Sequence, residues 1–264
     1  LARRKGPAAA GGGGAMISFR NGLEELPRRL AREIGDVRTG VAARRVLRGE
    51  HGFLVETAAG TLAAESVLLA VPADIAAHLL EEVTGGRSRT FAEIPYSPVA
   101  VVALGFRRED VAHPLDGFGY LVPRKEGRRT LGCLFPSALF PDRAPAGQVT
   151  LSAFAGGRTD PEIVSWDDDR IATTLLAEVG QALGIRSETK PVFQLVRRWP
   201  RAIPQYELGH GRFVDLAEEI ERDFPGLRIG GNFLHGVSVP DCIRNGGRLL
   251  QSWPTRSAAG PALT

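Results

Sequence analysis

One block of strand-like segments with no helical segment between them constrains the fold of this chain more than any other feature. Four apolar segments, residues 98–106, 117–126, 130–137 and 149–157, are separated by glycine, proline and charged residues typical of turns. Strands that follow one another through short turns pair antiparallel, because a parallel pair needs a long crossover. The block, which begins near Pro95, therefore predicts an antiparallel sheet.

Strand and helix candidates alternate on both sides of this block. Before it, the continuous apolar run Val67–Val71 ends at Pro72, and helical spacing follows over residues 75–83. Such a run is typical of a strand buried on both faces of a mostly parallel sheet. After the block come helices over 171–183 and 213–224 and strands over 191–199 and 227–231. The pattern predicts an α/β domain interrupted by an α+β domain that contains the antiparallel sheet.

Composition and charge exclude some classes of function. The chain has 264 residues and a formal net charge of +3 without a long basic run, so we expect no nucleic-acid partner. Cys133 and Cys242 have neither disulfide nor metal spacing, which indicates a reducing compartment. The run Asp167–Asp169 is interpreted as the acidic first turn of a helix, and we predict no metal site. No apolar stretch has the length of a membrane-spanning helix.

The amino-terminal residues 1–14 are rich in glycine and alanine, and we predict that they form a flexible segment. Their glycine run does not follow an apolar strand, so it does not fit a dinucleotide-binding loop. The chain begins with Leu1, and its single methionine is Met16. We interpret it as part of a longer protein, with a misplaced gene start as the alternative.

The stretch RIGGNFLHGVSVPDCIRNGG, residues 228–247, predicts a strand end, a glycine pair and a helix whose first residue is Pro240. The free N–H groups of a first helical turn, together with the helix dipole, favour negative charge. A flavin ring, which becomes anionic when reduced, would be stabilised there. A plain connection between strand and helix explains the same residues.

Residues 231–246, GNFLHGVSVPDCIRNG, strongly resemble the carboxyl-terminal flavin motif of the oxygen-dependent protoporphyrinogen oxidase family, which belongs to the larger flavin amine-oxidase group. Five other stretches agree with that family in order and spacing: FRNGLEELPRRLA, VLLAVPADIAAHLL, GFGYLVPRKEGRRTLGCLFPSALFPDRAP, LSAFAGG and RRWPRAIPQYELGH. The resemblance covers nearly everything from Phe19 to the end of the chain. It implies that 15–85 and 201–264 are parts of an incomplete FAD-binding domain, and that 86–200 bind a porphyrinogen.

The resemblance also implies which residues contact the cofactor and the substrate. The FAD contacts would be Val41 at the adenine end, Gly231 and Asn232 along the phosphates and ribityl chain, Val237, Ser238 and Val239 at the isoalloxazine, and Trp199 beside it. The tetrapyrrole pocket would be lined by Leu121, Leu134 and Phe154. From their alternating apolar pattern alone, these last three would be core residues.

The implied reaction is the FAD-dependent oxidation of protoporphyrinogen IX to protoporphyrin IX, with O2 as acceptor, in heme and porphyrin biosynthesis. Because the cofactor carries the difficult chemistry and the protein orients the substrate and excludes water, we predict no catalytic side chain. The partners would be the porphyrinogen and O2. The resemblance is compatible with a homodimer and with a cytoplasmic protein or one bound peripherally to a membrane.

The sequence departs from the family in lacking its amino-terminal glycine-rich dinucleotide fingerprint. We therefore expect the chain alone to bind flavin weakly or not at all, and its sheet to expose apolar edges. Three alternatives remain open. The first is oxidation of coproporphyrinogen III, and the second is the activity of another flavin enzyme such as a carotenoid desaturase or amine oxidase. The third is a non-catalytic fragment that lacks half of the flavin site and binds porphyrins or a partner.

Overall fold

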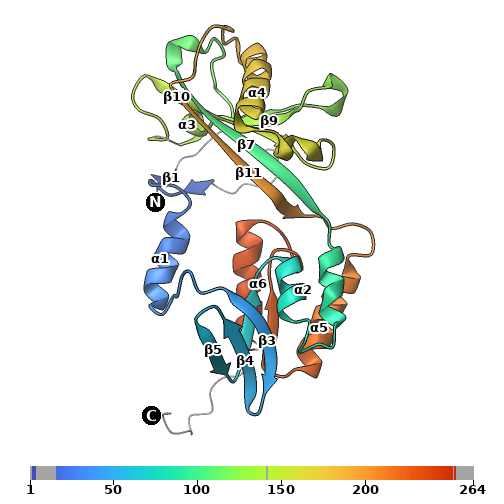
Figure 1. Ribbon diagram of the computed structural model, residues 1–264. Coiled ribbons are helices and arrows are strands. Elements are labelled where there is room, and N and C mark those ends of the chain that lie inside the picture. Colours follow the sequence, from blue (N-terminus) through green and yellow to red (C-terminus); the bar gives the residue numbers. More distant parts are fainter. Residues whose placement is uncertain (1, 4–15, 141, 252, 254–264) are drawn as a thin grey trace. The chain divides into compact units, whose positions relative to one another are not determined.

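The computed structural model describes residues 2–3, 16–140, 142–251 and 253, and the chain forms two compact units (Figure 1). Unit 1 comprises Leu1–Val37 and Ser97–Ala202, and unit 2 comprises Arg38–Tyr96 and Ile203–Thr264. The second segment of unit 1 therefore interrupts unit 2 along the sequence. This is the interrupted α/β organisation that the order of strand and helix candidates predicted.

The predicted boundaries were 85/86 and 200/201, whereas the units change at 96/97 and 202/203. Residues 16–37 group with unit 1 rather than with the predicted FAD-binding part. The physical reason is a contact from unit 1, in which the Arg143 guanidinium donates to Ser18 Oγ and, at 2.8 Å, to the Phe19 carbonyl oxygen. Apart from β1 (Ala2–Arg3), which pairs with β2 (Ile17–Ser18), the predicted flexible segment 1–14 lies outside the described residues.

Unit 1 is built on a five-stranded sheet with the order β11-β7-β10-β9-β8. The strands are β7 (Tyr96–Arg107), β8 (Gly119–Leu121), β9 (Thr130–Leu134), β10 (Gln148–Gly156) and β11 (Phe193–Pro204). Strand β10 pairs antiparallel with β7 and β9, and β9 pairs antiparallel with β8, so the predicted antiparallel sheet is confirmed. Strand β11 continues to Pro204, beyond its predicted end at residue 199.

Helix α4 (Asp168–Leu183) covers one face of this sheet and forms the core of unit 1 with it. The buried residues include Val102, Leu104, Phe106, Leu151, Ala153 and Cys133 from the strands, and Ile171, Leu175 and Val179 from the helix. Asp167 caps α4, since its Oδ1 accepts a hydrogen bond from the Arg170 N–H at 2.7 Å. The other helices of unit 1 are α1 (Glu25–Ile34) and the short α3 (Pro136–Leu139).

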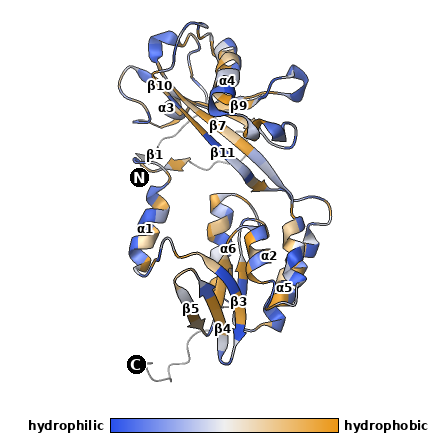
Figure 2. Cartoon of the chain, in the orientation of Figure 1, coloured by the Kyte–Doolittle hydropathy of each residue, from blue (hydrophilic) through white to orange (hydrophobic). Residues whose placement is uncertain are grey.

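Unit 2 contains two small sheets and three helices among the described residues. Strands β3 (Ala43–Gly49), β4 (Gly52–Thr57) and β5 (Gly60–Ala64) form an antiparallel sheet, and β6 (Val67–Ala70) pairs parallel with β12 (Leu227–Gly230). The helices are α2 (Ala73–Leu79), α5 (Gly211–Asp223) and α6 (Val239–Gln251). Figure 2 shows that strand β4 is largely hydrophobic, whereas α1 and α5 carry both hydrophobic and hydrophilic residues.

Short 3₁₀ turns connect several of these elements, at Arg87–Glu93, Arg108–Asp110, Arg124–Glu126 and Pro161–Ser165. Within the described ranges, no helix has the length and apolar character needed to cross a bilayer. Helix α6 buries none of its residues, and its apolar residues Ile243 and Leu250 are 65% and 64% exposed.

Candidate functional site

The loop that joins β12 to α6 leaves the carboxyl end of a parallel strand, the end at which open α/β sheets hold their ligands. Gly231 begins this loop with a φ of +145°, a backbone conformation that favours glycine. A Cβ atom there would lie 2.9 Å from the Val71 carbonyl oxygen and 2.8 Å from the Phe233 ring. Close packing of the chain against itself therefore requires glycine at this position.

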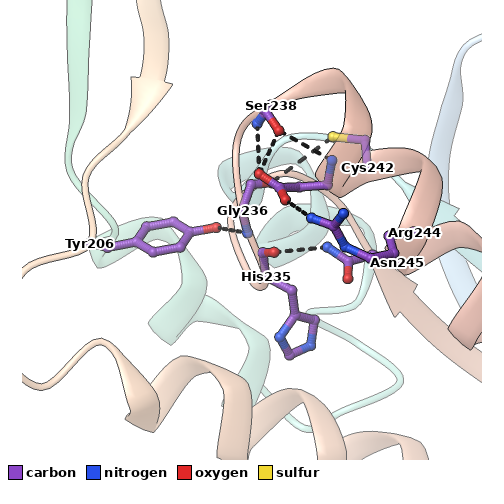
Figure 3. Close-up of polar contacts among 8 residues, drawn as sticks. Tyr206, His235, Gly236, Ser238, Cys242, Arg244 and Asn245 are labelled. Carbon is purple, nitrogen blue, oxygen red and sulfur yellow. Dashed lines mark hydrogen bonds and ion pairs between the residues drawn. The ribbon is translucent and has the colours of Figure 1, made fainter. Parts of the chain in front are cut away.

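The loop ends at a capped helix (Figure 3). Ser238 Oγ accepts a hydrogen bond from the Asp241 N–H at 3.2 Å and donates one to Asp241 Oδ2 at 2.5 Å. The same carboxylate oxygen accepts from the Ser238 N–H at 3.4 Å, which completes a reciprocal capping box. Helix α6 begins at Val239, so Pro240 is the second helical residue and its predicted place as the first was wrong.

The first turn of α6 already contains a carboxylate. Hydrogen bonds from Ser238, together with the neighbouring Arg244, hold the pKa of Asp241 below its ordinary value. Asp241 is therefore ionised at neutral pH, and the dipole of α6 stabilises its negative charge. The helix end consequently offers less positive potential to a ligand than the sequence alone indicated.

Between Val237 and Asp241, two backbone donors remain for a ligand. Pro240 has no N–H, and the Asp241 N–H is bonded to Ser238. Within the described part of the chain, the N–H groups of Val237 and Val239 have no acceptor, and the two residues are 47% and 56% exposed. Amide donors beside exposed apolar side chains fit a flat ring that carries carbonyl and nitrogen acceptors. This donor set therefore fits a flavin ring.

Tyr206, which the sequence analysis did not single out, holds the loop from another segment of unit 2. Its hydroxyl donates to the Asn232 carbonyl oxygen at 2.7 Å. The same hydroxyl accepts from the Gly236 N–H at 2.7 Å, the contact drawn in Figure 3. Burial raises the pKa of this hydroxyl, so it is protonated at neutral pH and can make both bonds. One side chain therefore fixes the loop at two points.

His210 supports Tyr206 from the same segment. The two rings stack with their centroids 4.1 Å apart and their planes at 15°. His210 Nε2 lies 2.8 Å from the Phe233 carbonyl oxygen, which can only accept, so Nε2 carries the proton. Its Nδ1 is buried with no partner among the residues that the structure describes. His210 thus has a structural role beside the loop.

His235 lies within the loop, and its ring is exposed. Its backbone, rather than its imidazole, makes the contact that orders the segment, because the His235 carbonyl oxygen accepts from Asn245 Nδ2 at 2.9 Å (Figure 3). Asn245 belongs to α6. This bond ties the helix back to the loop that precedes it.

The structure brings only some of the predicted FAD contacts together. Gly231, Asn232, Val237 and Ser238 lie in the loop before α6, and Val239 is the first residue of that helix. Val41 is half-buried and precedes β3 in unit 2, whereas Trp199 lies on β11 in unit 1 and is 45% exposed. The contacts assigned to Val41 at the adenine end and to Trp199 beside the isoalloxazine stay predictions.

The three predicted substrate residues lie on one face of the unit 1 sheet. Phe154 of β10 and Leu121 of β8 both pair with Gly132 of β9, so they flank a position that has no side chain. Leu134 follows Gly132 by two residues and therefore shares its face. Leu121 is 85% exposed, and Phe154 and Leu134 are half-buried, so none of the three is buried in the core. Their contact with a tetrapyrrole stays a prediction.

Comparison with known proteins supports the resemblance seen in the sequence. Residues 7–249 match the family model described as flavin containing amine oxidoreductase. The chain is 32% identical over 247 residues to protoporphyrinogen oxidase 1, chloroplastic, of Spinacia oleracea, covering 88% of the chain and 44% of that protein. It is 32% identical over 187 residues to coproporphyrinogen III oxidase of Bacillus subtilis, covering 70% of the chain and 39% of that protein. The chain therefore spans less than half the length of these curated relatives.

One solved structure has a similar fold. A protein from Exiguobacterium sp. 255-15, provisionally named a protoporphyrinogen oxidase, matches with a TM-score of 0.78 and 23% identity, over 89% of this chain and 51% of that one. At this identity the match shows a shared fold. It confirms the predicted fold class, an α/β domain interrupted by a domain with an antiparallel sheet.

Proposed function

Because the chain belongs to the flavin containing amine oxidoreductase family, we propose that it forms the flavin-ring and substrate-binding part of an oxygen-dependent protoporphyrinogen oxidase. The family match confirms FAD as the cofactor that the sequence predicted. The proposed reaction is the oxidation of protoporphyrinogen IX to protoporphyrin IX with O2 as acceptor. The capped loop before α6 is the observation on which the proposal rests.

In this proposal, the N–H groups of Val237 and Val239 hold acceptor atoms on one edge of the flavin ring, and their side chains contact its surface. Tyr206 keeps these donors in place by holding the loop at Asn232 and Gly236. FAD, when bound, would accept electrons from the porphyrinogen and pass them to O2. The role of the chain is to hold the two ligands and to exclude water.

The substrate part of the proposal uses the sheet of unit 1. Leu121 and Phe154 flank Gly132, so this part of the sheet face is apolar and carries no side chain at its middle position. A tetrapyrrole that covers apolar surface gains about 25 cal/mol per Å² removed from water. Contact area of this kind would orient the macrocycle without a catalytic side chain.

Protoporphyrinogen is preferred to coproporphyrinogen as substrate because the match to a protoporphyrinogen oxidase covers a larger share of the chain. The match to the spinach protein covers 88% of the chain, whereas the match to the Bacillus subtilis protein covers 70%. Homodimer formation and peripheral membrane association, both compatible with the resemblance, are further parts of the proposal for the longer protein.

Absorbance spectroscopy of the purified chain tests the flavin site. Flavin bands are recorded before and after addition of FAD, and porphyrin fluorescence then follows oxidation of protoporphyrinogen IX or coproporphyrinogen III in air. Val239→Asp adds a negative charge at the proposed ring contact, and Val37→Asp adds the same charge at another exposed valine, outside the loop. We expect Val239→Asp to weaken FAD binding and Val37→Asp to leave it unchanged.

The outcomes separate the proposed activity from its alternatives. The proposal is supported if the chain binds FAD, if Val239→Asp weakens that binding, and if protoporphyrinogen is oxidised faster than coproporphyrinogen. A chain that binds porphyrin but no flavin at saturating FAD favours the non-catalytic alternative. Equal loss of flavin in both variants would contradict the assignment of the loop.

A further inference from the structure

The sheet of unit 1 has one face that α4 does not cover, and it is largely apolar. We call it the open face and define it by Val99, Val101, Ala103, Leu121, Gly132, Leu134, Ser152, Phe154, Leu195, Arg197 and Trp199. On β7 and β10 these residues alternate with Ala100, Val102, Leu151 and Ala153, which are buried in the core against α4. The open face is most exposed at its edges, where Leu121, Trp199 and Leu195 are 85%, 45% and 38% exposed.

Contacts on β11 establish which of its residues share the open face. Val196 is buried in the core of unit 1. Arg198 donates to the Trp166 carbonyl oxygen at 2.7 Å and forms a 3.0 Å ion pair with Asp168 at the start of α4. Val196 and Arg198 therefore lie on the side of α4. Since side chains alternate along a strand, Leu195, Arg197 and Trp199 lie on the open face.

Arg197 differs from Arg198 in having no partner. Its side chain is exposed, and it makes no hydrogen bond or ion pair with any residue that the structure describes. It stands between the apolar Leu195 and Trp199 on the same face of the same strand. A guanidinium presents several donors in one plane, a geometry that matches a carboxylate in bidentate fashion.

The charges of the sheet are of one sign. The five strands contain no aspartate or glutamate, and their only charged residues are Arg107, Arg197, Arg198 and Arg201. The strands thus supply no carboxylate to neutralise Arg197. An apolar surface with a single unpaired cation among its exposed apolar side chains is complementary to a flat apolar ligand that carries a carboxylate.

We propose that Arg197 binds a carboxylate of the tetrapyrrole that lies on the open face. The assignment rests on the proposed function, because it takes the porphyrinogen as the occupant of this face. It adds a polar anchor to the apolar contacts of Leu121, Leu134 and Phe154. Arg197 would fix the orientation of the macrocycle in the plane of the sheet, which apolar contact alone does not specify.

Binding of a stable porphyrin to the full chain tests the anchor. Protoporphyrin IX and its dimethyl ester, in the same detergent, are titrated against wild type, Arg197→Gln, Arg197→Lys and Arg186→Gln, with binding followed by porphyrin absorbance. Arg186 is exposed and pairs with Glu188 after α4, away from the open face, so its variant controls for loss of one positive charge. Light scattering reports the mass of each variant.

We expect Arg197→Gln to weaken binding of the free acid about tenfold and to leave binding of the ester unchanged, because the ester has no carboxylate to pair. Arg197→Lys should keep part of the affinity, and Arg186→Gln should keep all of it. Two results would overturn the anchor and leave the proposed function standing. In the first, wild type and Arg197→Gln bind the free acid equally well. In the second, Arg197→Gln loses as much affinity for the ester as for the acid. If wild type binds neither the acid nor the ester, both the anchor and the proposed function are overturned. A doubled mass in that case identifies a second copy of the chain as the occupant of the open face.

Discussion

The hydroxyl of Tyr206 and the N–H of Gly236 lie 2.7 Å apart, although the two residues are separated by 30 positions in the sequence. The same hydroxyl donates to the Asn232 carbonyl oxygen, so it bridges two backbone groups of the loop before α6. The loop is therefore held by a side chain that does not itself occupy the proposed flavin contacts. Its geometry depends on the segment between β11 and α5 as much as on its own residues.

Removing that hydroxyl is expected to loosen the loop. Tyr206→Phe leaves the backbone groups of two half-buried residues, Asn232 and Gly236, without their partner, which should cost about 1 kcal/mol of folding free energy. FAD affinity should fall about tenfold because Val237 and Val239 are no longer held in place. Urea unfolding and an FAD titration measure the two effects. Tyr120→Phe is the control, since the Tyr120 hydroxyl forms no hydrogen bond within the described residues, and an equal loss of FAD affinity there would contradict the assignment.

The capping box predicts a dependence on pH. The pKa of Asp241 is lowered in the folded chain by its hydrogen bonds with Ser238, so ionised Asp241 contributes stability above its unfolded pKa. That contribution is lost as the pH falls through the lower, folded-state pKa, a window below about pH 4. Thermal unfolding between neutral and acid pH should therefore show a smaller acid loss for Asp241→Asn than for wild type. Asp116→Asn, at an exposed aspartate elsewhere, should follow wild type.

The two cysteines are expected to differ in reactivity. Burial raises the pKa of Cys133 to about 12, whereas Cys242 is exposed in the first turn of α6. A thiol reagent at neutral pH should label one thiol in the folded chain and the second only after unfolding. Cys242→Ser should abolish the rapid reaction, and bound FAD should slow it in wild type. Rapid labelling of both thiols in the folded chain would contradict the buried place of Cys133.

Local patterns predicted the elements that depend on nearby residues. The apolar run at Val67–Val71 forms the parallel strand β6, but only Leu69 of that strand is buried, so its predicted burial on both faces was wrong. Helix α4 ends just before Gly184, whose φ of +64° suits glycine. Ser238 and Asp241 have the spacing of a capping box, so the cap of α6 could have been read from the sequence. That signal was missed because the interpretation centred on Pro240.

Contacts between distant segments could not be predicted in the same way. Nothing in the spacing of Tyr206 or His210 indicates that they meet the loop after β12, because the meeting depends on how α5 and β12 pack. The grouping of residues 16–37 with unit 1 depends likewise on Arg143, which binds Ser18 and Phe19 across more than a hundred residues. Periodicity describes which face of an element is apolar, but it does not say which segment covers it.

Gly231, in the loop before α6, and Gly247, within α6, differ in the space available for an added Cβ atom. Gly231→Ala places a Cβ atom 2.9 Å from the Val71 carbonyl oxygen at a φ of +145°, which should destabilise the chain by about 2 kcal/mol. Gly247 lies in α6 with open space around its added Cβ, so Gly247→Ala should stabilise by about 0.5–1 kcal/mol through its better helix propensity. Urea unfolding followed by circular dichroism compares the two. If Gly231→Ala were as stable as wild type, the close approach of the loop to Val71 could not be what requires glycine there, and contact with a ligand would have to explain it.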